Sequence, residues 1–124
     1  MVRINVDLAS SVPAYQQVIQ ALKIEILSGR LKDGDRLIPI RELAKILKLN
    51  PNTVAKAYYT LEDEGFVESR QGSGNWVKRR APDLDGLRRS MLEGEAKAFL
   101  EKAFSLGATI EDVRRTIERI ASHE

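Results

Sequence analysis

Polar side chains gather at the start of one predicted helix, in a pattern that could bind nucleic acid. The stretch Leu47–Glu62 reads LKLNPNTVAKAYYTLE, and the helix is expected to begin at Pro51. At about 100° per residue, Asn52, Lys56 and Tyr59 lie within about 60° of one another on one side of this helix. An amide, an ammonium and a phenol are groups that can bind base edges and phosphates in a DNA major groove. A helix face exposed to water is polar in any case, so this face alone leaves the question of DNA binding open.

The residues around this polar face supply the helix that would hold it in place. Asn50 fits the position before the first helical residue, where its side-chain oxygen can accept a hydrogen bond from the free amides of the first turn. Pro51 fits the next position, because its missing N–H has no partner there. The opposite side is expected to face the core and carries Val54, Ala57, Tyr58 and Leu61.

A shorter helix is predicted ahead of this one, over about Ile40–Leu47, with Leu43 and Ala44 on its apolar face. The LKLN stretch is then a tight connection between the two helices. Two helices joined in this way form a helix-turn-helix, whose second helix, the recognition helix, enters the major groove.

Two further elements are predicted closer to the N-terminus. The alternation of apolar and polar residues in VRINVD, residues 2–7, predicts a short strand. A helix is expected next, with Pro13 in its first turn, a buried stripe that includes Tyr15, and Gly29 as its stop.

A β-hairpin is predicted directly after the recognition helix. Phe66-Val67 and Trp76-Val77 form short apolar runs on either side of the turn sequence Gln-Gly-Ser-Gly. Its tip, Arg70 to Gly74, is cationic and rich in glycine, so its backbone amides can approach a phosphate closely. A ribbon in this place is the wing of a winged helix. Lys78-Arg79-Arg80 follow, and they are either phosphate contacts or a solvated linker.

Ala81-Pro82 marks the expected boundary between a DNA-binding domain over residues 1–80 and a helical region over residues 83–124. In the second part, Thr109 with Asp112 three residues on resembles a capping box, which predicts the second helix of an αα-hairpin. A hairpin this small cannot enclose a core of its own, so its apolar faces need either the first domain or a second copy of the chain. The candidates for contacts between two copies are Leu87, Met91, Phe99, Leu100, Phe104, Val113, Ile117 and Ile120.

Composition and charge limit the class of protein. The 124 residues are 43% hydrophobic and 31% charged, as in ordinary soluble proteins. Residues 1–82 hold 13 Lys and Arg against 9 Asp and Glu, and residues 83–124 hold 7 against 9. A basic first part is compatible with nucleic-acid binding. No apolar run reaches the ~20 residues of a membrane span, and no signal-peptide core is present, so we expect a cytoplasmic protein without membrane partners.

Catalysis finds little support in these residues. The chain has no cysteine, its one histidine is His123, and no acid–base pair or metal-ligand set has a recognisable spacing. We therefore expect no enzyme activity, no cofactor and no metal, and no residue cluster names a small-molecule effector.

Two long stretches, PAYQQVIQALKIEILSGRLKDGDRL and IRELAKILKLNPNTVAKAYYTLEDEGFVESRQGSGNWV, strongly resemble the GntR family of bacterial transcription regulators. The resemblance covers about Val6 to Val77 by motif and the tail by length and helical pattern. NPNTVAKAY with a short two-helix tail is similar to the YtrA-type branch. The resemblance implies a mainly α fold with a small β-hairpin wing, that is, a winged helix-turn-helix domain plus a C-terminal αα-hairpin. It also implies a homodimer that binds a palindromic operator in double-stranded DNA, usually as a repressor.

The same resemblance implies which residues contact DNA. They are Arg41 in the second helix; Asn50, Asn52, Thr53, Lys56 and Tyr59 in the recognition helix; and Arg70, Gln71, Gly72 and Ser73 in the wing. One departure concerns the second helix, where this chain reads LIPIR and the family usually has Leu-Pro-Ser-Val-Arg. The capping serine is absent, and such a cap is worth about 1 kcal/mol.

Two other functions are open to the same elements. A winged helix can be a protein–protein interaction module without DNA binding, although such a module would not need the polar first turn, the outer lysine and the cationic wing together. A related branch of the family fuses the winged helix to an aminotransferase-like domain, but 124 residues are too few to include one.

Overall fold

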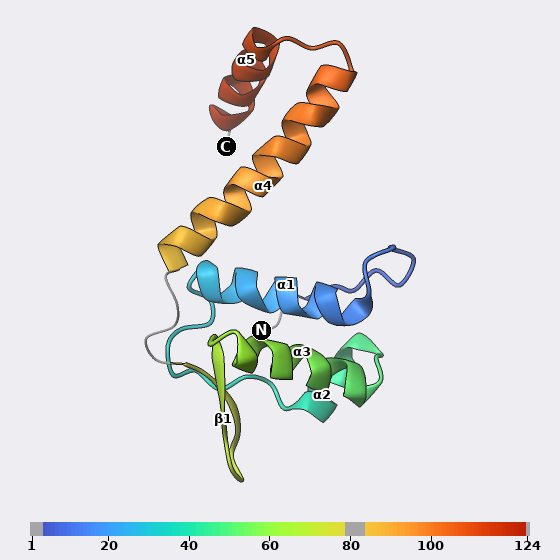
Figure 1. Cartoon of the computed structure of the whole chain (residues 1–124), viewed down its shortest axis with the longest axis vertical. Helices are drawn as coiled ribbons and strands as arrows, with labels where there is room; N and C mark the ends of the chain where they lie inside the picture. The colour runs from blue at the N-terminus through green and yellow to red at the C-terminus, as the bar shows by residue number, and fades with distance from the viewer. Residues whose placement is uncertain (1–3, 79–83, 124) are drawn as a thin grey trace. The chain divides into compact units, whose positions relative to one another are not determined.

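The computed structural model describes residues 4–78 and 84–123. Its elements are α1 (Ala14–Leu27), α2 (Ile40–Leu47), α3 (Pro51–Asp63), β1 (Val67–Arg70), β2 (Gly74–Val77), α4 (Leu84–Ser105) and α5 (Ile110–Ala121). Figure 1 shows this order of helices and the two-stranded ribbon. The predicted fold class, mainly helical with an antiparallel wing, is therefore confirmed. The chain divides into two compact units, Met1–Leu84 and Asp85–Glu124.

The first unit is built around α3. Both α1 and α2 pack against this helix, and β1 follows it closely (Figure 1). The side predicted to face the core is buried, as expected for its apolar residues: Val54, Ala57, Tyr58 and Leu61. The other sides of the core come from Val18, Leu22 and Ile26 of α1, from Leu43 of α2, and from Val67 and Val77 of the ribbon. The polar face of α3 is thus held by burial of its opposite side.

Tyr58 is the one core residue of α3 with a polar group. Its hydroxyl donates a hydrogen bond of 2.6 Å to the carbonyl of Ile38, in the segment that leads into α2. Burial raises the pKa of Tyr58 far above the ordinary value for a tyrosine, so the hydroxyl stays protonated and acts as a donor. This bond ties the start of α2 to the recognition helix.

The strand predicted over residues 2–7 is wrong for residues 4–7, which form no strand; residues 2 and 3 lie outside the described residues. The physical reason is a side chain of α1. Gln17 accepts the Asp7 N–H (2.8 Å) and donates to the Asp7 carbonyl (2.9 Å). At Asp7 the backbone is therefore bonded to a helix side chain instead of to a neighbouring strand.

The starts of α1 and α2 differ slightly from expectation. Pro13 and Pro39 stand one residue before the first helical residue, and neither helix has a side-chain cap. The absence of a capping side chain at α2 is thus confirmed, and the helix forms without it, with the Leu43 N–H bonded to the Pro39 carbonyl. The predicted stop of α1 is also confirmed, because Gly29 has a φ of +82°, which favours glycine.

The ribbon after α3 is an antiparallel hairpin in which Val67 pairs with Val77 and Arg70 with Gly74. The predicted hairpin is confirmed. Glu62 of α3 accepts a hydrogen bond of 2.8 Å from the Ser69 N–H, so the wing is attached to the recognition helix by a side chain as well as by the chain itself.

The second unit consists of α4 and α5. The predicted capping box is present: Thr109 Oγ1 accepts the Asp112 N–H (3.2 Å), and Asp112 Oδ2 accepts the Thr109 N–H (2.9 Å). Only Ala103 and Val113 are buried among the described residues of this unit. Its large apolar side chains that remain exposed are Leu92, Phe99, Phe104, Leu106, Ile110, Ile117 and Ile120.

The capping box makes the stability of α5 depend on pH in the acidic range. Hydrogen bonds from the Thr109 backbone and side chain lower the pKa of Asp112 below its ordinary value. A lowered pKa in the folded state means that the stabilisation is complete above the unfolded pKa, about 3.9, and is lost as the pH falls towards the folded pKa. We expect Asp112→Asn to flatten the pH dependence of α5 helicity below about pH 4. Circular dichroism of both proteins across this pH range measures it, and identical acid profiles would contradict the expectation.

Candidate nucleic-acid interface

The first turn of α3 combines a helix cap with exposed polar groups. Asn50 caps the helix, since its Oδ1 accepts the Asn52 N–H at 2.8 Å. Its oxygen therefore takes part in the cap, and its amide NH₂ can donate to a base or a phosphate. Asn52 is exposed and Thr53 is half-buried. The free N–H groups and the partial positive charge of this helix start favour an anion such as a phosphate.

Farther along the same face, Lys56 and Tyr59 are exposed, Tyr59 with 70% of its surface in solvent. The Lys56 ammonium lies 3.9 Å from the centroid of the Tyr15 ring of α1, within the range of a cation–π contact. Sequence reasoning placed Tyr15 in a buried stripe and missed this role. The contact holds the end of a flexible lysine on the exposed side of α3.

Arg41 is exposed and is the second residue of α2. Within residues 4–78 and 84–123 it has no ion pair, so its guanidinium is available to a phosphate. Its predicted place near the DNA face is compatible with this exposure.

The wing tip presents Gln71, Gly72 and Ser73 to solvent. Gly72 has a φ of +79°, and nothing lies within 4 Å of a Cβ built on it, so the turn requires glycine for its backbone angle and not for space. Arg70 is more constrained than predicted. Its Nη2 lies 2.9 Å from Glu68 Oε1, and its guanidinium stacks on the ring of Trp76.

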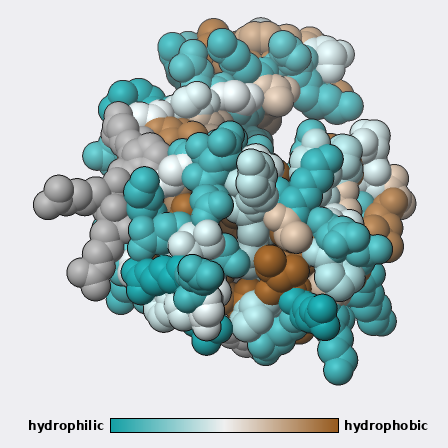
Figure 2. Space-filling view, turned by 60° about the horizontal axis from the view of Figure 1, so that its bottom comes forward, coloured by the Kyte–Doolittle hydropathy of each residue, from teal (hydrophilic) through white to brown (hydrophobic). Residues whose placement is uncertain are grey.

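The side of the molecule that carries the ribbon is mostly hydrophilic (Figure 2). Figure 2 brings forward the side of Figure 1 from which the ribbon projects, and this side shows mainly polar side chains with small apolar areas. Lys78 at the end of the wing is exposed, whereas Arg79 and Arg80 lie outside the described residues. Both open interpretations of that basic run stand.

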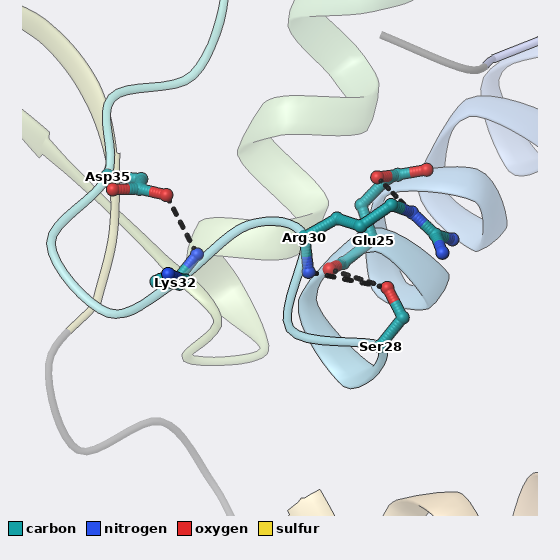
Figure 3. Close-up of polar contacts among 5 residues, drawn as sticks. All are labelled: Glu25, Ser28, Arg30, Lys32 and Asp35. Atoms are coloured by element: carbon teal, nitrogen blue, oxygen red, sulfur yellow. Dashed lines mark hydrogen bonds and ion pairs between the residues drawn. The ribbon is translucent and has the colours of Figure 1, made fainter. Parts of the chain in front are cut away.

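The connection between α1 and α2 is fixed by local polar contacts, as Figure 3 shows. Glu25 accepts from Arg30 Nε (2.8 Å), and the Ser28 hydroxyl donates to the Glu25 carbonyl (3.1 Å). The Lys32 N–H then donates to Asp35 Oδ2 (2.9 Å). Two successive turns thus connect α1 to the segment that lies along the wing.

A cavity of about 500 Å³ opens beside this connection. Its walls include Leu22, Leu37, Leu43 and Tyr58, together with the Glu25–Arg30 pair. Glu25 and Arg30 are bonded to each other, and Arg36 is the third charged residue of the lining, so the cavity points to no particular ligand. No group of His, Asp or Glu among the described residues could hold a metal ion. None of the described helices has the length and hydropathy of a membrane span.

Three packed helices with a helix-turn-helix and a β-hairpin wing define a winged-helix DNA-binding domain. The chain matches the family model described as "Bacterial regulatory proteins, gntR family" over residues 14–77. It therefore belongs to the GntR family and is a DNA-binding transcription regulator and not an enzyme, as the sequence predicted.

Relatives and solved structures agree with this membership. The chain is 37% identical over 121 residues to the HTH-type transcriptional repressor YtrA of Bacillus subtilis (strain 168), covering 96% of this chain and 92% of the relative. A GntR family transcriptional regulator from Listeria monocytogenes has a TM-score of 0.78 at 26% identity, covering 90% of this chain and 98% of that one. YtrA from Sulfolobus acidocaldarius, a GntR-family transcription factor, has a TM-score of 0.60 at 39% identity over 79% and 97%. The similarity to YtrA-type regulators is thus confirmed.

Proposed function

We propose that this protein is a cytoplasmic repressor that binds a palindromic operator as a homodimer. The observation that carries the DNA-binding part is the exposed face of α3, from Asn52 to Tyr59, beside a wing whose glycine turn is exposed to solvent. Repression is supported by the similarity to a protein named as a transcriptional repressor along 92% of its length.

The homodimer is supported by the apolar surface of the second unit. The predicted contact residues Phe99, Phe104, Ile117 and Ile120 are each about half exposed. Leu87, Met91 and Leu100 are half-buried, and Val113 is already buried in the single chain, so it has less to contribute to a partner. Full burial of a large apolar side chain is worth about 1.5–3 kcal/mol, which favours a covered face over an exposed one.

A dimer of this kind would set the symmetry of the DNA site. A two-fold axis relates two identical recognition helices, so the two half-sites of the operator would form a palindrome. The residues proposed to read or hold each half-site are Arg41, Asn50, Asn52, Thr53, Lys56, Tyr59, Arg70, Gln71, Gly72 and Ser73.

Selection of bound duplexes from a random DNA pool tests this function. We expect an enriched palindrome whose affinity falls with salt by about 0.9 log unit per neutralised phosphate and log unit of salt. A protein-interaction module would enrich no sequence and would shift no DNA at any salt. An enriched site without two-fold symmetry would contradict the dimer but not DNA binding.

Lys56→Ala is expected to weaken binding to the selected duplex about 5- to 150-fold, the range of about 1–3 kcal/mol for a direct groove contact. The fold should remain intact, because the side chain is exposed and its contact with Tyr15 is worth only about 0.5–1 kcal/mol. Fluorescence anisotropy gives the affinity and thermal melting gives the stability. An unchanged affinity would contradict the proposed groove face.

A further inference from the structure

A third extended segment, which the sequence did not predict, pairs with β2 of the wing. Arg36 forms an antiparallel bridge with Trp76 of β2. On either side, the Leu37 N–H donates to the Asn75 carbonyl (2.8 Å), and the Val77 N–H donates to the Asp35 carbonyl (2.7 Å). The segment before α2 therefore runs along the wing and brings Arg36 into it.

Strand alternation places three side chains in one row across this ribbon. Trp76 pairs with Glu68 on one side and with Arg36 on the other. The neighbouring pair, Val67 with Val77, is buried in the core, so the row around Trp76 occupies the outer face. Of the two charged residues in this row, Glu68 is bonded to Arg70 and Arg36 is exposed to solvent.

Two guanidinium groups share the indole of Trp76. Arg70 lies 4.5 Å and Arg36 lies 5.9 Å from the ring centroid. Gly74, with a φ of +97°, makes room for one of them, because a Cβ there would come within 3.2 Å of the Arg36 Nε and Nη2 atoms. The Trp76 N–H has no acceptor among the described residues. The ring therefore contacts the two arginines through its faces and not through a hydrogen bond.

The two arginines differ in charge compensation. Arg70 is paired with Glu68 at 2.9 Å, whereas Arg36 is exposed and has no ion pair within residues 4–78 and 84–123. A planar guanidinium that lies over a ring, at the outer limit of a cation–π contact, and is not paired to a carboxylate is suited to bind a phosphate with two parallel hydrogen bonds.

We propose that Arg36 is a phosphate-binding residue of the DNA interface, positioned by Trp76, and that Glu68 restrains its neighbour Arg70. This rests on the proposed DNA-binding face, and it extends that face from the wing tip to the segment before α2. A phosphate contact carries no sequence information, so Arg36 contributes to affinity for any duplex.

The first test compares Arg36→Gln with the wild-type protein on a mixed-sequence duplex and on the duplex selected above. We expect binding to both to weaken about 5- to 10-fold near 0.1 M salt, with a salt slope shallower by about 0.9 per protomer. Asn52→Ala, which removes a proposed base contact, should weaken only the selected duplex. Unchanged affinity and slope in Arg36→Gln would overturn the proposal.

The second test separates position from charge. Trp76→Leu is expected to weaken binding about threefold with the salt slope retained, since both arginines keep their charge but lose the ring. Trp76→Phe should restore the affinity, because the ring faces carry the contact. Thermal melting shows whether both variants fold. If folded Trp76→Phe binds as weakly as folded Trp76→Leu, the positioning role is wrong.

The third test and its control concern the acidic neighbour. Glu68→Gln should free Arg70 and strengthen binding about threefold, and unchanged affinity would show that Glu68 imposes no restraint. Arg115→Gln removes the same charge as Arg36→Gln, but from an exposed ion pair in α5, and should leave DNA binding unchanged. A wild-type protein that binds no duplex at low salt would refute the DNA-binding face itself, whereas wild-type binding with an unaffected Arg36→Gln refutes only this extension.

Discussion

Removal of residues 83–124 is expected to give a monomer whose operator affinity is lower by about 100-fold or more. Two linked recognition helices bind two half-sites with an effective concentration that a single helix does not have, and this avidity is commonly on the order of 10²–10⁴. The first unit has its own core, including Val18, Leu43 and Leu61, so it should stay folded after the truncation. Sedimentation measures the mass and anisotropy measures the affinity.

A full-length variant provides the matched comparison. Phe104 is 50% exposed, so Phe104→Asp should disrupt the dimer without unfolding the chain. Arg115→Gln lies on the other side of α5 from Val113 and Ile117, and it should sediment like the wild-type protein. A truncated chain that still forms a dimer would refute the role proposed for the tail.

Leu61→Ala is expected to lower the free energy of unfolding of the first unit by about 2–5 kcal/mol, the usual cost of a leucine cavity in a well-packed core. Leu61 is fully buried on the inner side of α3. The loss arises from stability alone, because the side chain faces away from the proposed DNA face. Urea unfolding gives the change in free energy.

The control for this variant is Leu8→Ala, since 73% of Leu8 is exposed. Its effect should stay within about 0.5 kcal/mol. Under conditions where Leu61→Ala is still folded, its DNA affinity should match that of the wild-type protein. A cost below that of Leu8→Ala would mean that α3 is not anchored through Leu61.

The elements of this protein were predictable where a local rule decides the conformation. The cap at Asn50, the inner face of α3, the glycine stop at Gly29 and the box between Thr109 and Asp112 all follow from neighbours within a few residues. The predicted strand is absent at residues 4–7, because alternation does not say which group will bond the backbone. Gln17, ten residues on from Asp7, took that place.

By itself, then, the sequence determined the order of helices, the hairpin and which side of the recognition helix is polar, because helical and strand periods are properties of the local chain. Only the tertiary structure decided how the exposed cations are held. Lys56 rests on Tyr15 and Arg36 on Trp76, each pair separated by about 40 residues. Such contacts depend on how α1 and the segment before α2 pack against α3 and the wing. A local sequence pattern cannot predict a contact between residues that lie so far apart in the chain.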